Sequence, residues 1–121
     1  MDSSRNTLSK EERLCGKNAI STLLAKGKFA KIDNLSYCFK ANEVGFSRIM
    51  ISVPKKFFKR AVKRNLLKRR IREAYRTQKH MLEGTNYDIL FMYRTKEILT
   101  YDQIFTAIGK IMEEISLHAN K

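Results

Sequence analysis

The sequence contains no tryptophan, a single proline and only two cysteines, and it has no long apolar run. Cys15 and Cys38 do not combine with His80 and His118 at a spacing that structural zinc sites use, so we expect two free thiols and no metal. No segment approaches the roughly 18 apolar residues that a membrane span needs. The N-terminus lacks the apolar region of a signal peptide, which predicts a cytoplasmic protein without a membrane partner.

Positive charge is what the chain has in excess. Its 25 Lys and Arg residues outnumber 12 Asp and Glu residues, which gives a formal net charge of +13 and a pI near 10.0. Residues 55–76 alone hold eleven of the basic residues and one acid, Glu73. A solvated helix surface ordinarily mixes both signs. Such a one-sided segment therefore favours a polyanionic partner, and nucleic acid is the leading candidate.

Hydrophobic periodicity and turn residues predict one domain over residues 9–118 that follows a disordered tail at 1–8. A capping box at Ser9–Glu12 indicates an early helical turn, and Gly27 stands where a helix would end. Pro54 ends a strand, and a second capping box, Thr100–Gln103, begins the last helix. We expect helices at 17–26, 59–79 and from 100 onward, strands at 35–41, 46–53 and 87–93, and a further candidate strand at 29–32.

The last helix carries an apolar stripe that consists of Ile104, Phe105, Ile108, Ile111, Met112 and Ile115. A small sheet with helices packed on it is the architecture that this order of elements predicts.

The helix at 59–79 has two unlike faces. At 100° per residue, one arc carries a group of polar residues, and the opposite side carries Leu67, Ile71 and Ala74, with Tyr75 at its edge. The polar arc consists of Asn65, Lys68, Arg69, Arg72 and Arg76. The apolar side can dock on a sheet while the cations neutralise phosphates. The alternative is a basic helix face that only meets solvent.

The aromatic residues allow two interpretations. Phe57 and Phe58, just before the basic helix, either stack on bases or fill the core beneath the helix start. Tyr37 and Phe39 lie on one face of a strand, and they too either stack on bases of single-stranded RNA or belong to the core.

Residues for chemistry are scattered. Asp2, Asp33, Asp88 and Asp102 suggest no carboxylate pair for metal-dependent phosphodiester cleavage. No phosphate-binding glycine loop is present, and Cys15 has no recognisable catalytic partner. We therefore expect no catalytic residue and no metal site in the chain.

Three ordered segments carry a family resemblance. They are Ile51–Lys56, Arg60–Asn65 and Lys68–Arg76, and Tyr87–Ile89 follows where a last strand would begin. Together they resemble the signature of the bacterial ribonuclease P protein. The resemblance implies an α/β (α+β) two-layer sandwich with about four strands and three helices, in the order αβββαβα. It also implies a left-handed βαβ crossover, against the usual handedness.

The resemblance further implies a function. The catalyst would be a large RNA with bound magnesium, and the protein would hold no cofactor of its own. Its partners would be that RNA and precursor tRNA, whose 5′ leader would lie in a cleft between the first helix and the sheet. We expect a monomer within the ribonucleoprotein and no binding to DNA. The alternatives are a ribosomal-protein-like RNA-binding or RNA-chaperone module and, third, a self-sufficient nuclease.

Site residues are carried over position by position. For the catalytic RNA they are Lys55, Lys56, Arg60, Lys63, Arg64, Asn65, Lys68, Arg69, Arg72 and Arg76. For the leader cleft they are Arg13, Ile20, Leu24, Tyr37, Cys38 and Phe39. The sequence departs from the family at Leu66, where many relatives have Arg, and at Ile20 and Leu24, where Phe is common.

Overall fold

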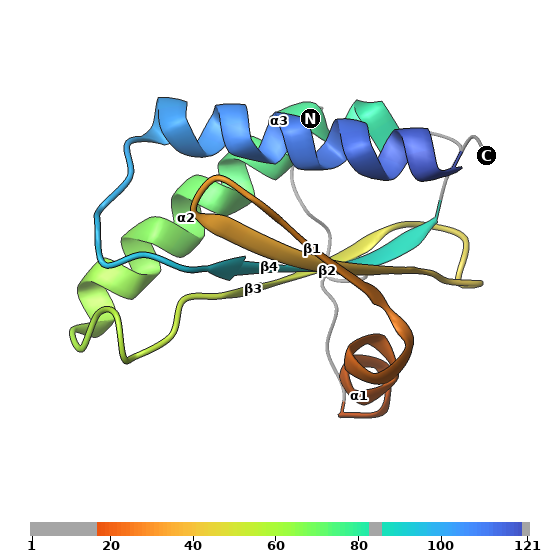
Figure 1. Cartoon of the computed structure of the whole chain (residues 1–121), viewed down its shortest axis with the longest axis horizontal. Coiled ribbons are helices and arrows are strands. Elements are labelled where there is room, and N and C mark those ends of the chain that lie inside the picture. Colours follow the sequence, from red (N-terminus) through yellow and green to blue (C-terminus); the bar gives the residue numbers. More distant parts are fainter. Residues whose placement is uncertain (1–16, 83–85, 120–121) are drawn as a thin grey trace, which may run out of the picture.

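The computed structural model describes residues 17–82 and 86–119. The expected tail at 1–8, the capping box at Ser9–Glu12, Arg13 and Cys15 lie outside these residues. Three helices, a short 3₁₀ helix and a four-stranded sheet make up the described part (Figure 1). In chain order they are α1 (Lys17–Lys26), β1 (Lys28–Ile32), β2 (Leu35–Ala41), β3 (Arg48–Ser52), α2 (Ala61–Gln78), η3 (Lys79–Leu82), β4 (Tyr87–Tyr93) and α3 (Tyr101–Ala119).

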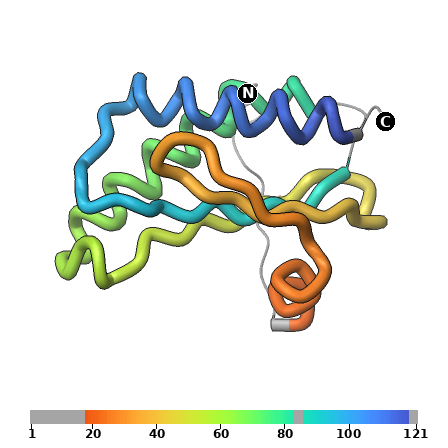
Figure 2. Tube along the Cα trace, in the orientation of Figure 1, coloured from red at the N-terminus to blue at the C-terminus, as the bar shows by residue number. Residues whose placement is uncertain are grey.

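The sheet has the strand order β1-β2-β4-β3. β2 is antiparallel to both β1 and β4, whereas β3 and β4 are parallel. Parallel neighbours need a crossover connection, and here α2 supplies it. Figure 2 shows the chain leaving β3, running back across the sheet as α2 and returning as β4. The crossover is left-handed, as the resemblance implied.

The main core lies between the sheet and the layer formed by α2 and α3 (Figure 1). Alternation along the strands turns Leu35, Tyr37 and Phe39 toward these helices, and all three are buried. From α2, Leu67 and Ile71 pack onto the same sheet face and are fully buried, as the helical periodicity predicted.

α1 lies on the opposite face of the sheet (Figure 1). Leu23 of α1, Cys38 of β2 and Leu90 of β4 form a second, smaller cluster of buried residues there. Gly27 follows α1 at a close approach, because a Cβ atom on it would meet the Leu23 carbonyl oxygen at 2.5 Å and Cys38 Sγ at 2.6 Å. The sequence suggested a helix-ending glycine at this position, and lack of space is what requires it.

Several element ends differ from the sequence-based expectations. The candidate strand at 29–32 is present as β1, while the long helix begins at Ala61 and gives way to η3 after Gln78. The second capping box is confirmed: Gln103 N donates to Thr100 Oγ1 at 3.2 Å, and Thr100 N donates to Gln103 Oε1 at 2.9 Å. Phe105, expected in the buried stripe of α3, is 38% exposed instead.

Candidate nucleic-acid interface

A basic face runs along α2 and the loop before it. α2 begins after Arg60, whose backbone is extended and whose side chain makes no capping hydrogen bond. The side chains on this face are exposed or, for Lys68, half-buried. We call the following set the α2 basic face: Lys55, Lys56, Arg60, Lys63, Asn65, Lys68, Arg69 and Arg72. Asn65, Lys68, Arg69 and Arg72 lie on the side of α2 away from Leu67 and Ile71, so the helix is anchored by one side and presents these polar residues on the other. Lys55, Lys56 and Arg60 precede the helix, and Lys63 lies in its first turn.

Two of the predicted RNA-binding arginines also hold the fold together. Arg64 Nη1 donates to the carbonyl oxygens of Phe58 at 2.9 Å and Lys59 at 2.8 Å, so it fastens the loop before α2. Arg76 donates through Nε and Nη2 to both oxygens of Glu73, at 2.9 and 2.7 Å. These hydrogen bonds lower the pKa of Glu73. Both arginines are half-buried, and their contact with RNA stays a prediction.

A further arginine on α2 was absent from the predicted set. Arg70 Nη1 donates to the Leu99 carbonyl oxygen at 2.5 Å and ties α2 to the segment before α3. The sequence offered no signal that would separate this arginine from its neighbours.

The two phenylalanines before α2 have different surroundings. Phe58 is buried, with its ring centroid 5.7 Å from that of Tyr93. Phe57 is half-buried, and Lys56 Nζ lies 5.2 Å from its ring centroid. The core interpretation therefore holds for Phe58, and the half-buried Phe57 also packs against the main core. The exposed part of Phe57 helps to position Lys56, a cation of the α2 basic face.

The sheet face that α1 partly covers offers a second surface. Strand register aligns one residue from each strand in a row: Lys31 with Ser36, Ser36 with Met92, and Met92 with Ser52. Lys31 is exposed, and the other three side chains are half-buried. On α1, Ile20 packs against the small cluster while Leu24 is 46% exposed. We call Lys31, Ser36, Ser52 and Met92 the open row.

Two residues assigned to the leader cleft are on the wrong side of the sheet. Tyr37 and Phe39 are 2% and 7% exposed, and they face α2 and α3 rather than α1. Burial, and then the charge of Glu114, raise the pKa of the Tyr37 hydroxyl. Cys38 does face α1, but it is fully buried and its Sγ donates to the Leu23 carbonyl oxygen at 3.4 Å. Successive strand residues point to opposite faces, so these three could not share one cleft.

The open row is what sequence reasoning missed. The alternation of β2 already placed Ser36 opposite Tyr37, but the sequence did not indicate which face α1 would cover. Once that face is known, the same alternation identifies Ser36, Ser52 and Met92.

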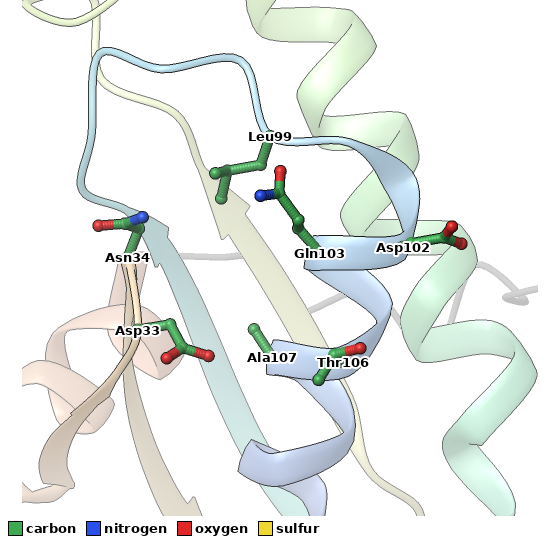
Figure 3. A pocket seen from close by; sticks show the side chains of 7 residues that line it. All are labelled: Asp33, Asn34, Leu99, Asp102, Gln103, Thr106 and Ala107. Atoms are coloured by element: carbon green, nitrogen blue, oxygen red, sulfur yellow. The ribbon is translucent and has the colours of Figure 1, made fainter.

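A pocket of about 660 Å³ lies away from both surfaces, where the β1–β2 turn meets the start of α3. Figure 3 shows Asp33 and Asn34 on one side of it and Leu99, Gln103 and Ala107 on the other, with Asp102 turned toward α2. Two carboxylates near this pocket make it unsuited to phosphate. Among residues 17–82 and 86–119, no three His, Cys, Asp or Glu side chains gather to hold a metal ion.

Comparison with known proteins identifies the family. A family model described as "Ribonuclease P" matches residues 8–116, which is most of the chain. The chain belongs to the ribonuclease P protein family. The ribonuclease P protein component of Porphyromonas gingivalis strain W83 is 35% identical over 118 residues, covering 90% of this chain and 86% of that protein. That of Blochmanniella floridana is 32% identical over 96 residues, covering 79% and 78%.

Solved structures of the family share the fold. The ribonuclease P protein of Staphylococcus aureus gives a TM-score of 0.76 at 26% identity, covering 86% of this chain and 94% of that one. The protein from Thermotoga maritima gives 0.75 at 26% identity, covering 85% and 96%. Members of this family are protein components of ribonuclease P, an endoribonuclease. No helix in the described part of the chain is long and apolar enough to cross a membrane.

Proposed function

We propose that this chain binds the catalytic RNA of ribonuclease P through the α2 basic face and the 5′ leader of precursor tRNA along the open row. The holoenzyme would remove that leader and leave the mature tRNA 5′ end. The observation that carries the proposal is the separation of side chains on α2. Arg69 and Arg72 are exposed and Lys68 is half-buried along one side of the helix, while Leu67 and Ile71 pack the other side against the sheet.

Electrostatics favours RNA at the α2 basic face. Each phosphate that a Lys or Arg neutralises releases condensed counterions, so binding gains free energy at low salt. Like charges one helical turn apart repel one another mildly, and a bound polyanion relieves that repulsion. Asn65 lies among the cations, and its amide can form hydrogen bonds with a base edge or a ribose hydroxyl. Such a contact can add specificity that phosphate contacts alone do not provide.

The open row suits a single strand. It consists of two serines, a methionine and a lysine, and Met92 packs against the same small cluster as Ile20 of α1. In this proposal Leu24 of α1, which is 46% exposed, also contacts the RNA strand. A strand of RNA can lay its bases against such a surface while Lys31 meets a phosphate. Ile20 and Leu24 exclude water but stack less strongly than the phenylalanines common in relatives, so affinity for the leader is expected to be modest.

We assign the chemistry to the RNA partner and its magnesium ions, and only binding and positioning to the protein. In this proposal the protein acts in the cytoplasm, as a single copy within the ribonucleoprotein, and it has no role on DNA.

Reconstitution tests the proposal. The purified chain is incubated with precursor tRNA alone, and then with a bacterial ribonuclease P RNA at a magnesium concentration where that RNA is nearly inactive. We expect no cleavage by the chain alone and restored cleavage at the mature 5′ end by the mixture. Cleavage by the chain without the RNA, or a mixture no more active than the RNA, would reject the proposal.

The leader contact has its own test. Ser52→Glu places a negative charge on the open row, so it should reduce the preference of the holoenzyme for precursor over mature tRNA. Thr106→Glu, which adds the same charge to an exposed position on α3, is the matched control. If both variants showed the same preference for precursor over mature tRNA, the proposal that the leader binds along the open row would be wrong.

A further inference from the structure

Two aromatic rings of α3 lie beside α2 at the edge of the main core, against which Tyr101 packs. Tyr101 is half-buried and Phe105, one turn later, is 38% exposed. Their ring centroids are 5.9 Å apart with an angle of 46° between the planes. The core beneath is already filled by Ile104 and Ile108, which are fully buried, so Phe105 is left at the surface.

The contact between the two helices positions this aromatic pair. Gln78 of α2 donates through Nε2 to the Phe105 carbonyl oxygen at 3.1 Å. Gly109 lets the helices approach here, because a Cβ atom on it would meet Gln78 Oε1 at 2.7 Å. Arg76 of α2 is near enough that Tyr101 contributes to its raised pKa, after the larger effect of Glu73. Arg70 holds the Leu99 carbonyl oxygen and Gln78 holds that of Phe105, so the two aromatic residues lie beside the part of α2 that runs from Arg70 to Gln78 and includes Arg72 and Arg76.

We propose that Tyr101 and Phe105 form a stacking platform for an unpaired base of the RNA whose phosphates lie on the α2 basic face. The inference rests on the proposed function and adds a second contact, on α3, to that interface. A partly exposed aromatic pair beside a helix that carries cations is the kind of surface on which proteins hold single-stranded bases.

Local charge favours a base over a phosphate at this point. Glu73 already pairs with Arg76, and Asp102 follows Tyr101 and points toward α2 (Figure 3). These carboxylates repel a phosphate but not the neutral face of a base. The backbone of the RNA would follow Arg69 and Arg72, and one base would turn toward α3.

Substitution of Phe105 tests the platform by affinity. Phe105→Ser should weaken binding of a bacterial ribonuclease P RNA about tenfold, because one stacked base contributes on that order. The slope of log affinity against log salt should not change, since stacking releases no counterions. Phe46→Ser is the matched control, because Phe46 is 37% exposed in the loop between β2 and β3. Urea unfolding of each variant shows whether the fold is retained.

The absence of tryptophan in the chain provides a direct reporter. Phe105→Trp creates a single indole that should keep RNA affinity, and its fluorescence should be quenched when RNA binds. Phe46→Trp should not be quenched. If Phe105→Ser and Phe46→Ser bind the RNA with equal affinity and the fluorescence of neither indole changes when RNA binds, the proposed stacking platform is wrong. Loss of affinity on changing Arg69 and Arg72 would still support the α2 basic face in that case, so the two proposals fail separately.

Discussion

Arg48 and Asp88 form a two-point ion pair across the parallel strands β3 and β4. Arg48 Nε lies 2.8 Å from Asp88 Oδ1, and Arg48 Nη2 lies 2.8 Å from Asp88 Oδ2. Asn42 Nδ2 also donates to Asp88 Oδ1, at 2.8 Å, and to the Phe46 carbonyl oxygen. The side chains of Arg48 and Asp88 are only 22% and 11% exposed. One carboxylate therefore holds the β2–β3 loop and the first residue of β3 in place.

Removing one member of this pair should destabilise the protein. Asp88→Ala leaves the guanidinium of Arg48 without this counterion in a partly dry site, and we expect the free energy of unfolding to fall by about 3 kcal/mol. Urea denaturation measures it. The double variant Arg48→Met with Asp88→Leu should recover part of the loss, because no uncompensated charge is left. A loss below about 0.5 kcal/mol in the single variant would mean that solvent screens the pair.

The α2 basic face should be visible in the salt dependence of RNA binding. Arg69→Glu combined with Arg72→Glu would remove two of the proposed phosphate contacts, so the slope of log affinity against log salt should flatten by about two units while folding survives. Lys96→Glu combined with Lys110→Glu makes the same change in charge at exposed positions off α2. An equal change of slope in both double variants would indicate a response to net charge alone.

Gly27→Ala should disturb the docking of α1. The added methyl group would lie 2.5 Å from the Leu23 carbonyl oxygen and 2.6 Å from Cys38 Sγ, so helix or strand must move. Overpacking of this kind costs about 1–3 kcal/mol in the free energy of unfolding. Cys38→Ala in the same chain frees only the second contact and should restore part of the stability. Full stability of Gly27→Ala would show that α1 shifts freely on the sheet.

The Cys38 thiol should react slowly in the folded protein. Burial raises the pKa of the Cys38 thiol, so the folded state keeps its proton at a pH where an unfolded thiol has lost it. The stabilisation is fully present below the ordinary thiol pKa of about 8.5 and is lost as pH rises through the folded pKa. Alkylation of a Cys15→Ser variant at pH 8, followed by mass spectrometry, should be slow in buffer and fast in urea. Equally fast alkylation in buffer and in urea would show that the Cys38 thiol is accessible to solvent in the folded protein.

Tyr93 should be needed for the segment that leads into α3. Its hydroxyl accepts a hydrogen bond from Leu99 N at 2.9 Å and donates one to the Glu97 carbonyl oxygen. Tyr93→Phe leaves the Leu99 N–H without this acceptor, and the free energy of unfolding should fall by about 1–3 kcal/mol. Tyr101→Phe, on a half-buried residue, is a control that should change stability little. Equal losses in the two variants would argue against this role.

Local patterns in the sequence determined much of this protein. The period of α2 identified which of its residues would be buried and which would carry charge outward, because a helix fixes its faces within a few residues. The capping box at Thr100 and the alternation along β2 are local for the same reason. The order of residues in the basic motifs also indicated the protein family, which net charge alone does not specify.

Only the tertiary structure decided how these faces meet. Nothing near Cys38 in the sequence shows that α1 covers its side of β2, so Tyr37 and Phe39 were assigned to a cleft on the face that α2 and α3 bury. Arg70 likewise differs from Arg69 only by its contact with the Leu99 carbonyl oxygen, 29 residues away. Phe105 matched the apolar stripe, yet it stands at the surface because other side chains fill the core. Contacts between distant segments depend on the packing of the whole chain, which local periodicity does not encode.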